Sequence, residues 1–139
     1  MRSIILIATL LPSIACASDW VELARTPEAR VMLDRQSVEI LGSEAKASLK
    51  FLYHNKQPGQ TVTLGKPFDS SINQYYLDCV TMRFQVLDLT LFHDNDTVGN
   101  FHADLDRNNF LEPKAGTGVM YLLDKVCAAG KAGSAARKN

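Results

Sequence analysis

The stretch that decides the fold is Ala45-Lys46-Ala47-Ser48-Leu49-Lys50-Phe51-Leu52-Tyr53. Every second residue from Ala45 to Tyr53 is apolar, while Lys46 and Lys50 fall between them. Side chains of a β-strand point to opposite faces with a period of two, so the pattern predicts a strand with one buried and one solvated face. Half-buried strands of this kind are typical of antiparallel sheets.

Similar short runs lie on both sides of this stretch. The expected strands cover residues 19–23, 31–34, 36–41, 72–79, 80–92 and 98–102. From Leu87 to Phe92 the alternation blurs, which indicates a bulge or burial on both faces. Residues 55–71 are rich in Gly, Pro and Ser and predict a long, mobile connection, and residues 93–97 predict a polar hairpin loop.

A helix is expected from Thr117, as the capping residue, to about Ala129. Its apolar positions follow the i, i+3, i+4, i+7 rule and are Val119, Leu122, Leu123 and Val126. A sheet with one apolar face needs a cover, and the apolar stripe of this helix needs a partner. The sequence therefore predicts an α+β fold in one domain, residues 18–129, in which antiparallel strands are followed by a C-terminal helix packed on one face. Residues 130–139 predict a disordered basic tail.

The N-terminus has the three parts of a secretory signal peptide. Arg2 precedes an apolar run over residues 4–11, and Ala15-Cys16-Ala17 places small residues before Ser18. The run is shorter than the roughly 20 residues that cross a bilayer. We expect residues 1–17 to be removed, which gives a soluble exported chain, periplasmic or secreted. The alternative is an outer-membrane lipoprotein with its lipid on Cys16, although Ser13 stands where such signals usually have an apolar residue.

Removal of Cys16 leaves two cysteines, Cys79 and Cys127. An even number of cysteines in an oxidising compartment predicts a disulfide, which is favoured over two independent buried thiols. Closing the long loop between them contributes roughly 4 kcal/mol by chain-entropy reasoning. The bond would fasten the expected helix to the sheet. Neither cysteine lies in a C-x-x-C motif, so a zinc or redox role has no support.

The charge balance and motifs argue against several classes of protein. The 139 residues carry 15 basic and 15 acidic side chains, which excludes the basic footprint of a nucleic-acid binder. The sequence has no Gly-rich phosphate loop, G-x-S-x-G or H-E-x-x-H motif, so there is no reason to propose an enzyme or a cofactor. A hydrolase using one of the loop histidines, His54, His93 or His102, is the weakest hypothesis because sequence gives no geometry for a catalytic base.

Two clusters of acidic residues partly resemble metal sites. Residues 104–108 begin like a calcium loop, but Asn109 stands where Gly is needed and Ala115 where the bidentate Glu is needed. A solvated acidic loop is the better interpretation. The second cluster fits no known ligand spacing and is interpreted as surface residues; it comprises His93, Asp94, Asp96 and His102.

Tyr76 and Asp78 lie on the strand face opposite Cys79 and form a candidate recognition surface. Exposed aromatic side chains are enriched at protein interfaces. The alternative for Tyr76 and the other strand aromatics is packing inside the sheet.

The order of several short motifs resembles the surface-adhesin protein E family over residues 19–127. The motifs are Asp19-Trp20, Leu33-Asp34-x-x-Ser37-Val38, Tyr76-Leu77-Asp78-Cys79 followed by Arg83, and Leu111-Glu112-Pro113 before a helix that contains Cys127. The resemblance implies a curved antiparallel sheet of about six strands. It also implies a C-terminal helix held to the concave face by a disulfide, for which Cys79 and Cys127 are the matching positions.

The family's best-known member is an outer-membrane lipoprotein that binds host extracellular-matrix proteins and plasminogen. The resemblance thus implies an exported, non-enzymatic module that binds a protein partner, as a monomer or a homodimer, with no nucleic acid, cofactor or transmembrane segment. The alternative is a soluble periplasmic structural or accessory protein with no host partner.

Overall fold

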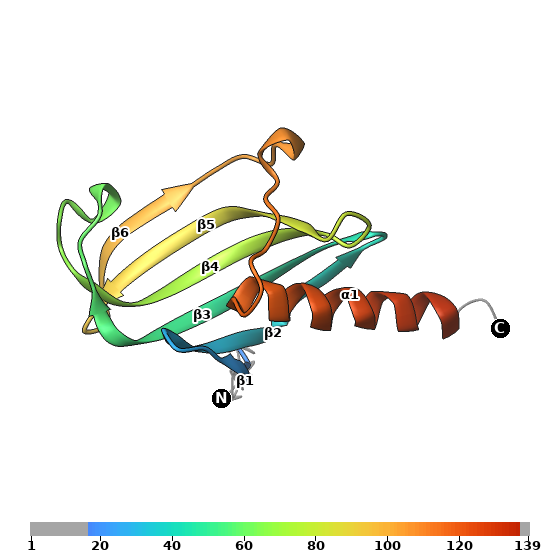
Figure 1. The fold of residues 1–139 in the computed structure, drawn as a ribbon, viewed down its shortest axis with the longest axis horizontal. Helices are drawn as coiled ribbons and strands as arrows, with labels where there is room; N and C mark the ends of the chain where they lie inside the picture. The colour runs from blue at the N-terminus through green and yellow to red at the C-terminus, as the bar shows by residue number, and fades with distance from the viewer. Residues whose placement is uncertain (1–16, 137–139) are drawn as a thin grey trace, which may run out of the picture.

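The computed structural model describes residues 17–136, with the side chains of residues 17–129. Most of the predicted signal peptide lies outside the described residues, so its removal stays a prediction. Six strands form one antiparallel sheet in which each strand pairs with the next along the chain. They are β1 (Trp20–Arg25), β2 (Ala29–Leu41), β3 (Glu44–Gln57), β4 (Phe68–Asp78), β5 (Arg83–His93) and β6 (Asp96–His102). The sheet is curved, and helix α1 (Gly118–Ala136) lies across its concave face (Figure 1).

The alternation that predicted β3 is reproduced in the burial of its side chains. Ala45, Ala47 and Leu49 are buried on the concave face, and the lysines between them remain partly exposed on the convex face. Lys50 places its ammonium 4.8 Å from the centre of the Trp20 ring. The convex face of this strand therefore stays in contact with water.

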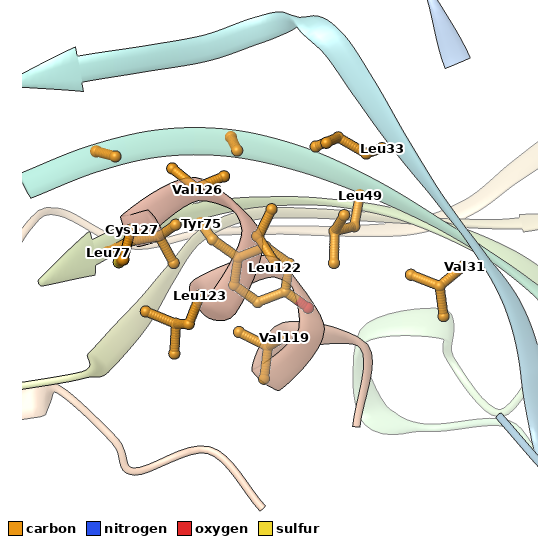
Figure 2. Close-up of a cluster of buried hydrophobic side chains, with 12 residues drawn as sticks. Val31, Leu33, Leu49, Tyr75, Leu77, Val119, Leu122, Leu123, Val126 and Cys127 are labelled. Carbon is orange, nitrogen blue, oxygen red and sulfur yellow. The ribbon is translucent and has the colours of Figure 1, made fainter. Parts of the chain in front are cut away.

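The main core lies between α1 and the concave face (Figure 2). The helix contributes the predicted stripe, of which Leu122 and Leu123 are fully buried. Small side chains opposite them on β3, at Ala45 and Ala47, leave room for the helix. The strand side of the core consists of Val31, Leu33, Ala45, Ala47, Leu49, Tyr75 and Leu77. The α+β class is therefore confirmed.

The predicted disulfide joins Cys79, after β4, to Cys127 of α1, with Cα atoms 5.3 Å apart. The helix begins where the capping position was predicted, but the Thr117 hydroxyl donates back to the carbonyl of Lys114. Its backbone continues to Ala136, seven residues beyond the expected end at Ala129. The extension is rich in alanine, the strongest helix former, so the first part of the predicted tail is helical. Residues 137–139 lie outside the described part.

Two further strand predictions differ from the structure. The runs at 31–34 and 36–41 form a single strand, β2, whose register shifts between Asp34 and Glu39. The connection predicted over residues 55–71 spans only 58–67, because β3 continues to Gln57 and β4 begins at Phe68. This connection contains a hydrogen-bonded 3-10 turn, η1 (Thr61–Thr63), so it is shorter and more regular than expected, and its mobility stays a prediction.

The irregularity predicted after Leu87 is present. The pairing of β4 with β5 shifts register between Gln74 and Tyr75, which leaves Leu87 as the additional residue on β5. The predicted edge strand at 98–102 is β6, which begins two residues earlier, at Asp96. Among the residues that the structure describes, no helix has the length and apolarity needed to span a membrane.

Candidate recognition surface

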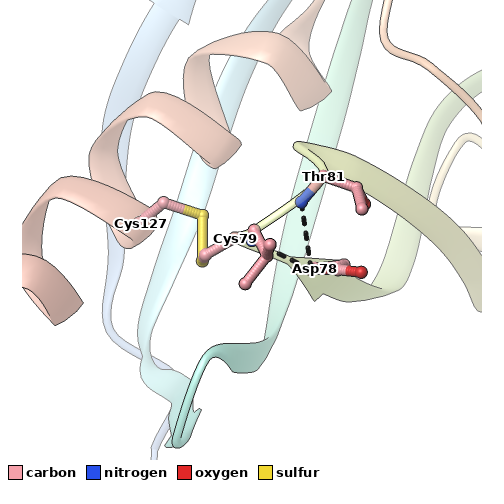
Figure 3. The surroundings of a disulfide bond; sticks show 5 residues. Asp78, Cys79, Thr81 and Cys127 are labelled. Atoms are coloured by element: carbon pink, nitrogen blue, oxygen red, sulfur yellow. Dashed lines mark hydrogen bonds between the residues drawn. A yellow bond between two sulfur atoms is a disulfide. The ribbon is translucent and has the colours of Figure 1, made fainter.

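The turn between β4 and β5 is organised by Asp78. Its carboxylate accepts hydrogen bonds from the backbone amides of Val80 at 2.9 Å and Thr81 at 3.2 Å (Figure 3). Asp side chains commonly hold turns in this way. The neighbouring Cys79 points to the opposite face and is bonded to Cys127 (Figure 3). Adjacent residues at the end of β4 thus fix the turn on one face and the helix on the other.

The β6–α1 connection, residues 103–117, runs along the edge of β5 that β6 leaves uncovered. Its first backbone contact is from the amide of Ala103 to the carbonyl of Leu87, at 2.8 Å. Farther on, Phe84 and Leu111 exchange hydrogen bonds of 3.0 and 2.8 Å. Between these points the Gln85 side chain, 6% exposed, accepts from one backbone amide of the connection and donates to one carbonyl. The part of the connection from Ala103 to Leu111 is therefore held to β5 along its length.

Tyr76 is buried beneath this connection and is only 7% exposed. Its ring lies 6.1 Å from that of Phe110, centre to centre, and its hydroxyl donates to the carboxylate of Glu44. Arg107 donates to the other oxygen of the same carboxylate. The expectation that Tyr76 is an exposed aromatic residue is therefore wrong. The reason is tertiary: the β6–α1 connection folds over the face of β4 opposite the helix.

Hydrogen bonding sets the protonation of this group of side chains. The donors on Arg107 and Tyr76 hold the pKa of Glu44 below its usual value, despite an opposing effect of partial burial. The same bond to Glu44 raises the pKa of Tyr76. Both shifts favour an ionised Glu44 and a protonated Tyr76, which is the arrangement that the hydrogen bonds need.

A pocket of about 120 Å³ opens between the β4–β5 turn and the β6–α1 connection. It is lined by Asp78, Thr81, Arg83, Arg107 and Phe110 and is called the Arg83–Arg107 pocket below. Arg83 donates to Glu112 at 3.1 Å, in a pair whose side chains are 47% and 77% exposed. Exposed pairs of this kind are weak and exchange readily with other partners.

Two guanidinium groups lie at the pocket, and each is paired with a carboxylate, Arg83 with Glu112 and Arg107 with Glu44. A guanidinium group has several N–H donors in a planar fork that matches two carboxylate oxygens. The Phe110 ring and the Thr81 hydroxyl add apolar and polar contacts beside the two guanidinium groups. Asp78 thus lies at this surface, and its role in recognition stays a prediction.

Sequence reasoning missed most of the pocket. Arg83 was noticed only as part of the family resemblance, and neither Arg107 nor Phe110 was proposed as a site residue. The spacing of Asp106 and Asn108 could have predicted a capped turn that places Arg107. In the structure, the Asp106 carboxylate accepts a hydrogen bond from the Asn108 amide at 3.0 Å and caps the turn η2 (Arg107–Asn109). At the level of the sequence, this spacing is compared only with the start of a calcium-binding loop.

His93 and His102 lie in different clusters, and both are surface residues as expected. His93 lies 3.6 Å from Asp69 and 3.3 Å from Asp94, in a partly exposed group at the β5–β6 turn. His102 lies 2.7 Å from Asp88 and 3.5 Å from Asp104. These are ordinary surface pairs, and the Asp69 carboxylate is also occupied by the backbone amide of Asp94.

The fold defines a class of protein: a small, disulfide-stabilised α+β domain in which one C-terminal helix packs on a six-stranded antiparallel sheet. The model of the surface-adhesin protein E family matches residues 20–128. The match covers most of the chain, and the chain belongs to this family.

Two solved structures share the fold. Protein E of Haemophilus influenzae in crystal form II has a TM-score of 0.54 and 11% identity, over 88% of this chain and 97% of that one. Protein E from non-typeable Haemophilus influenzae has a TM-score of 0.51 and 12% identity, over 86% of this chain and 82% of that one. Identities this low support a common fold and nothing finer. A comparison with curated proteins finds no significant match.

Proposed function

We propose that this chain is an exported, non-enzymatic module that binds a protein partner at or near the cell surface. The observation that carries the proposal is membership of the surface-adhesin protein E family across residues 20–128. The candidate partners are host extracellular-matrix proteins and plasminogen. The partner's contact would include an acidic side chain seated in the Arg83–Arg107 pocket.

The binding test uses the purified mature protein, with plasminogen and a basement-membrane extract as immobilised probes. Saturable binding to either probe supports the proposal, and no binding to either one contradicts the assignment of a host partner. Arg83→Glu is the pocket variant, because it reverses a charge that points into the pocket from an exposed position. Arg35→Glu is the matched control, since Arg35 is also exposed and is paired with Asp19, the residue before β1. Weaker binding by the first variant alone supports the pocket.

The alternative is a soluble periplasmic accessory protein of the same fold. The sequence before Cys16 favours it over a lipoprotein, because Ser13 lies at the position that usually carries an apolar residue. Fractionation of the native cells separates the two functions. A protein confined to the periplasm cannot meet a host partner, whereas one in the outer membrane or the medium can.

A further inference from the structure

The η1 loop, residues 58–67, presents an apolar tip to solvent. Leu64 is 88% exposed, more than any other large apolar side chain among residues 17–129, and Val62 in the same loop is 37% exposed. Phe101 on β6 is 46% exposed. Phe101 lies on the same face of β6 as Gly99. A Cβ on Gly99 would lie 2.3 Å from the carbonyl oxygen of Val62, so this face of β6 packs directly against the loop. The loop that carries Val62 and Leu64 lies beside β6 (Figure 1), the strand that carries Phe101.

Leu64 is held in a backbone conformation that leucine rarely adopts. Its φ is 53° and its ψ is 40°, in the left-handed region that glycine and asparagine adopt at lower cost. A residue in a strained conformation is often retained because its side chain has a function. The left-handed conformation and the high exposure both belong to Leu64, the residue that ends η1.

The rest of the loop is built rigidly around this residue. Thr63 is fully buried, and its hydroxyl both accepts from the amide of Gln60 and donates to the Gln60 carbonyl. The amides of Leu64 and Gly65 donate to Thr61 and Gln60 at 3.1 and 3.0 Å. A Cβ on Gly59 would lie 2.1 Å from the backbone of Gly65, so the two ends of the loop are in direct contact. The tip is therefore preorganised.

The charged residue nearest to Leu64 in the sequence is Lys66, and Asp69 and Lys56 lie farther from it. From His54 to Pro67 the sequence contains Lys56 and Lys66, both exposed, and no Asp or Glu. Apolar side chains flanked by lysines are typical of segments that enter the headgroup region of anionic membranes. A protruding tip also needs no complementary pocket in a lipid surface, whereas a protein partner would have to supply one.

We propose that the η1 loop inserts Leu64 into the surface of an anionic lipid membrane, with Val62 and Phe101 at the interface and Lys56 and Lys66 near the headgroups. This membrane contact is separate from the Arg83–Arg107 pocket and does not depend on the proposed protein partner.

The experiment measures partition of the purified mature protein onto vesicles of equal parts phosphatidylglycerol and phosphatidylcholine, with pure phosphatidylcholine vesicles for comparison. The wild type is expected to float with the anionic vesicles. Leu64→Asn should lower the partition coefficient on the order of tenfold, because it removes the inserted side chain. Lys56→Gln and Lys66→Gln should each lower it about fivefold.

Leu64→Asn is chosen because asparagine tolerates the left-handed conformation, so its melting temperature should equal or exceed that of the wild type. Val80→Asn is the matched control: Val80 is 76% exposed on the β4–β5 turn, and its replacement should leave partition unchanged. A second readout uses the Trp20→Phe/Leu64→Trp double variant, in which the added tryptophan is the only one in the chain. Its emission should shift to the blue with anionic vesicles.

No flotation of the wild type, or equal flotation of the wild type and Leu64→Asn, overturns the inference. If Leu64→Asn weakens binding to plasminogen or matrix extract but not to vesicles, the loop is a protein contact and the inference is also overturned. Because vesicles contain no protein, failure here leaves the proposed protein-binding function untouched.

Discussion

The hydroxyl of Tyr76 donates a hydrogen bond to the carboxylate of Glu44, across the two neighbouring strands β4 and β3. Arg107 joins them from a position 63 residues after Glu44. The three side chains fasten the β6–α1 connection over the convex face and so build one wall of the Arg83–Arg107 pocket. The stability of this contact can be measured in two independent ways.

Tyr76→Phe removes the hydroxyl while keeping the ring against Phe110. We expect the free energy of unfolding to fall by about 1–2 kcal/mol, because the lost hydrogen bond involves an ionised acceptor. Urea unfolding followed by circular dichroism measures this change. Tyr121→Phe is the control, since Tyr121 is 42% exposed on α1 and its replacement should have little effect. Equal effects of the two substitutions would contradict the contact described for Tyr76.

Glu44 should contribute to the acid sensitivity of the fold. Its folded pKa is lowered, so its stabilising contribution is complete above the unfolded pKa near 4.5 and is lost as the pH falls through the folded pKa. Glu44→Gln should therefore reduce stability at pH 7, and the difference from the wild type should shrink as the pH falls below 4.5 and through the folded pKa. Urea unfolding at several pH values measures it. A difference that is the same at every pH would argue against an ionised Glu44.

The disulfide should account for a large part of the stability. The bond closes a loop with a sequence separation of 48. Chain-entropy reasoning therefore predicts that the Cys79→Ser/Cys127→Ser double variant is less stable by up to about 4 kcal/mol. Reduced wild-type protein is the control and should unfold at nearly the same urea concentration as the double variant. A double variant as stable as the oxidised wild type would show that the core alone holds α1 on the sheet.

His102 should titrate above a normal histidine. The hydrogen bond to Asp88, which is opposite it in the β5–β6 ladder, raises its pKa, with a smaller effect from Asp104. Because the pKa of His102 is higher in the folded state, the His102–Asp88 pair contributes its full stabilisation of β6 below pH 6.5. This stabilisation is lost as the pH rises through the folded pKa of His102. NMR titration of the ring protons should show a lower His102 pKa in Asp88→Asn. Asp96→Asn is the control and should leave it unchanged; the same shift in both variants would rule out the Asp88 pair.

The main architecture could be predicted because its signals are local and periodic. The alternation over residues 45–53 places Ala45 and Leu49 on one face whatever follows them, and the spacing of Val119, Leu122 and Val126 fixes the buried side of α1. The family resemblance supplied the number of strands and the concave position of the helix.

The site could not be predicted because it depends on contacts between distant segments. Tyr76 alternates like an outward-facing residue, and only the path of residues 103–117 buries it. The internal contacts of the η1 loop also could not be predicted from composition. Its Gly and Pro residues are typical of mobile connections, but the backbone of Gly65 leaves no space for a side chain at Gly59, and the backbone of Val62 leaves none at Gly99 of β6.

The central claim is that an exported chain is fastened across its concave face by a covalent bond between Cys79 and Cys127. The intact mass of the protein purified from its native cells tests this claim most directly. The account predicts the mass of residues 18–139 less two hydrogens, with no uptake of a thiol-alkylating reagent until the protein is reduced. A chain that retains residues 1–17 and takes up the reagent at both cysteines without reduction would contradict it.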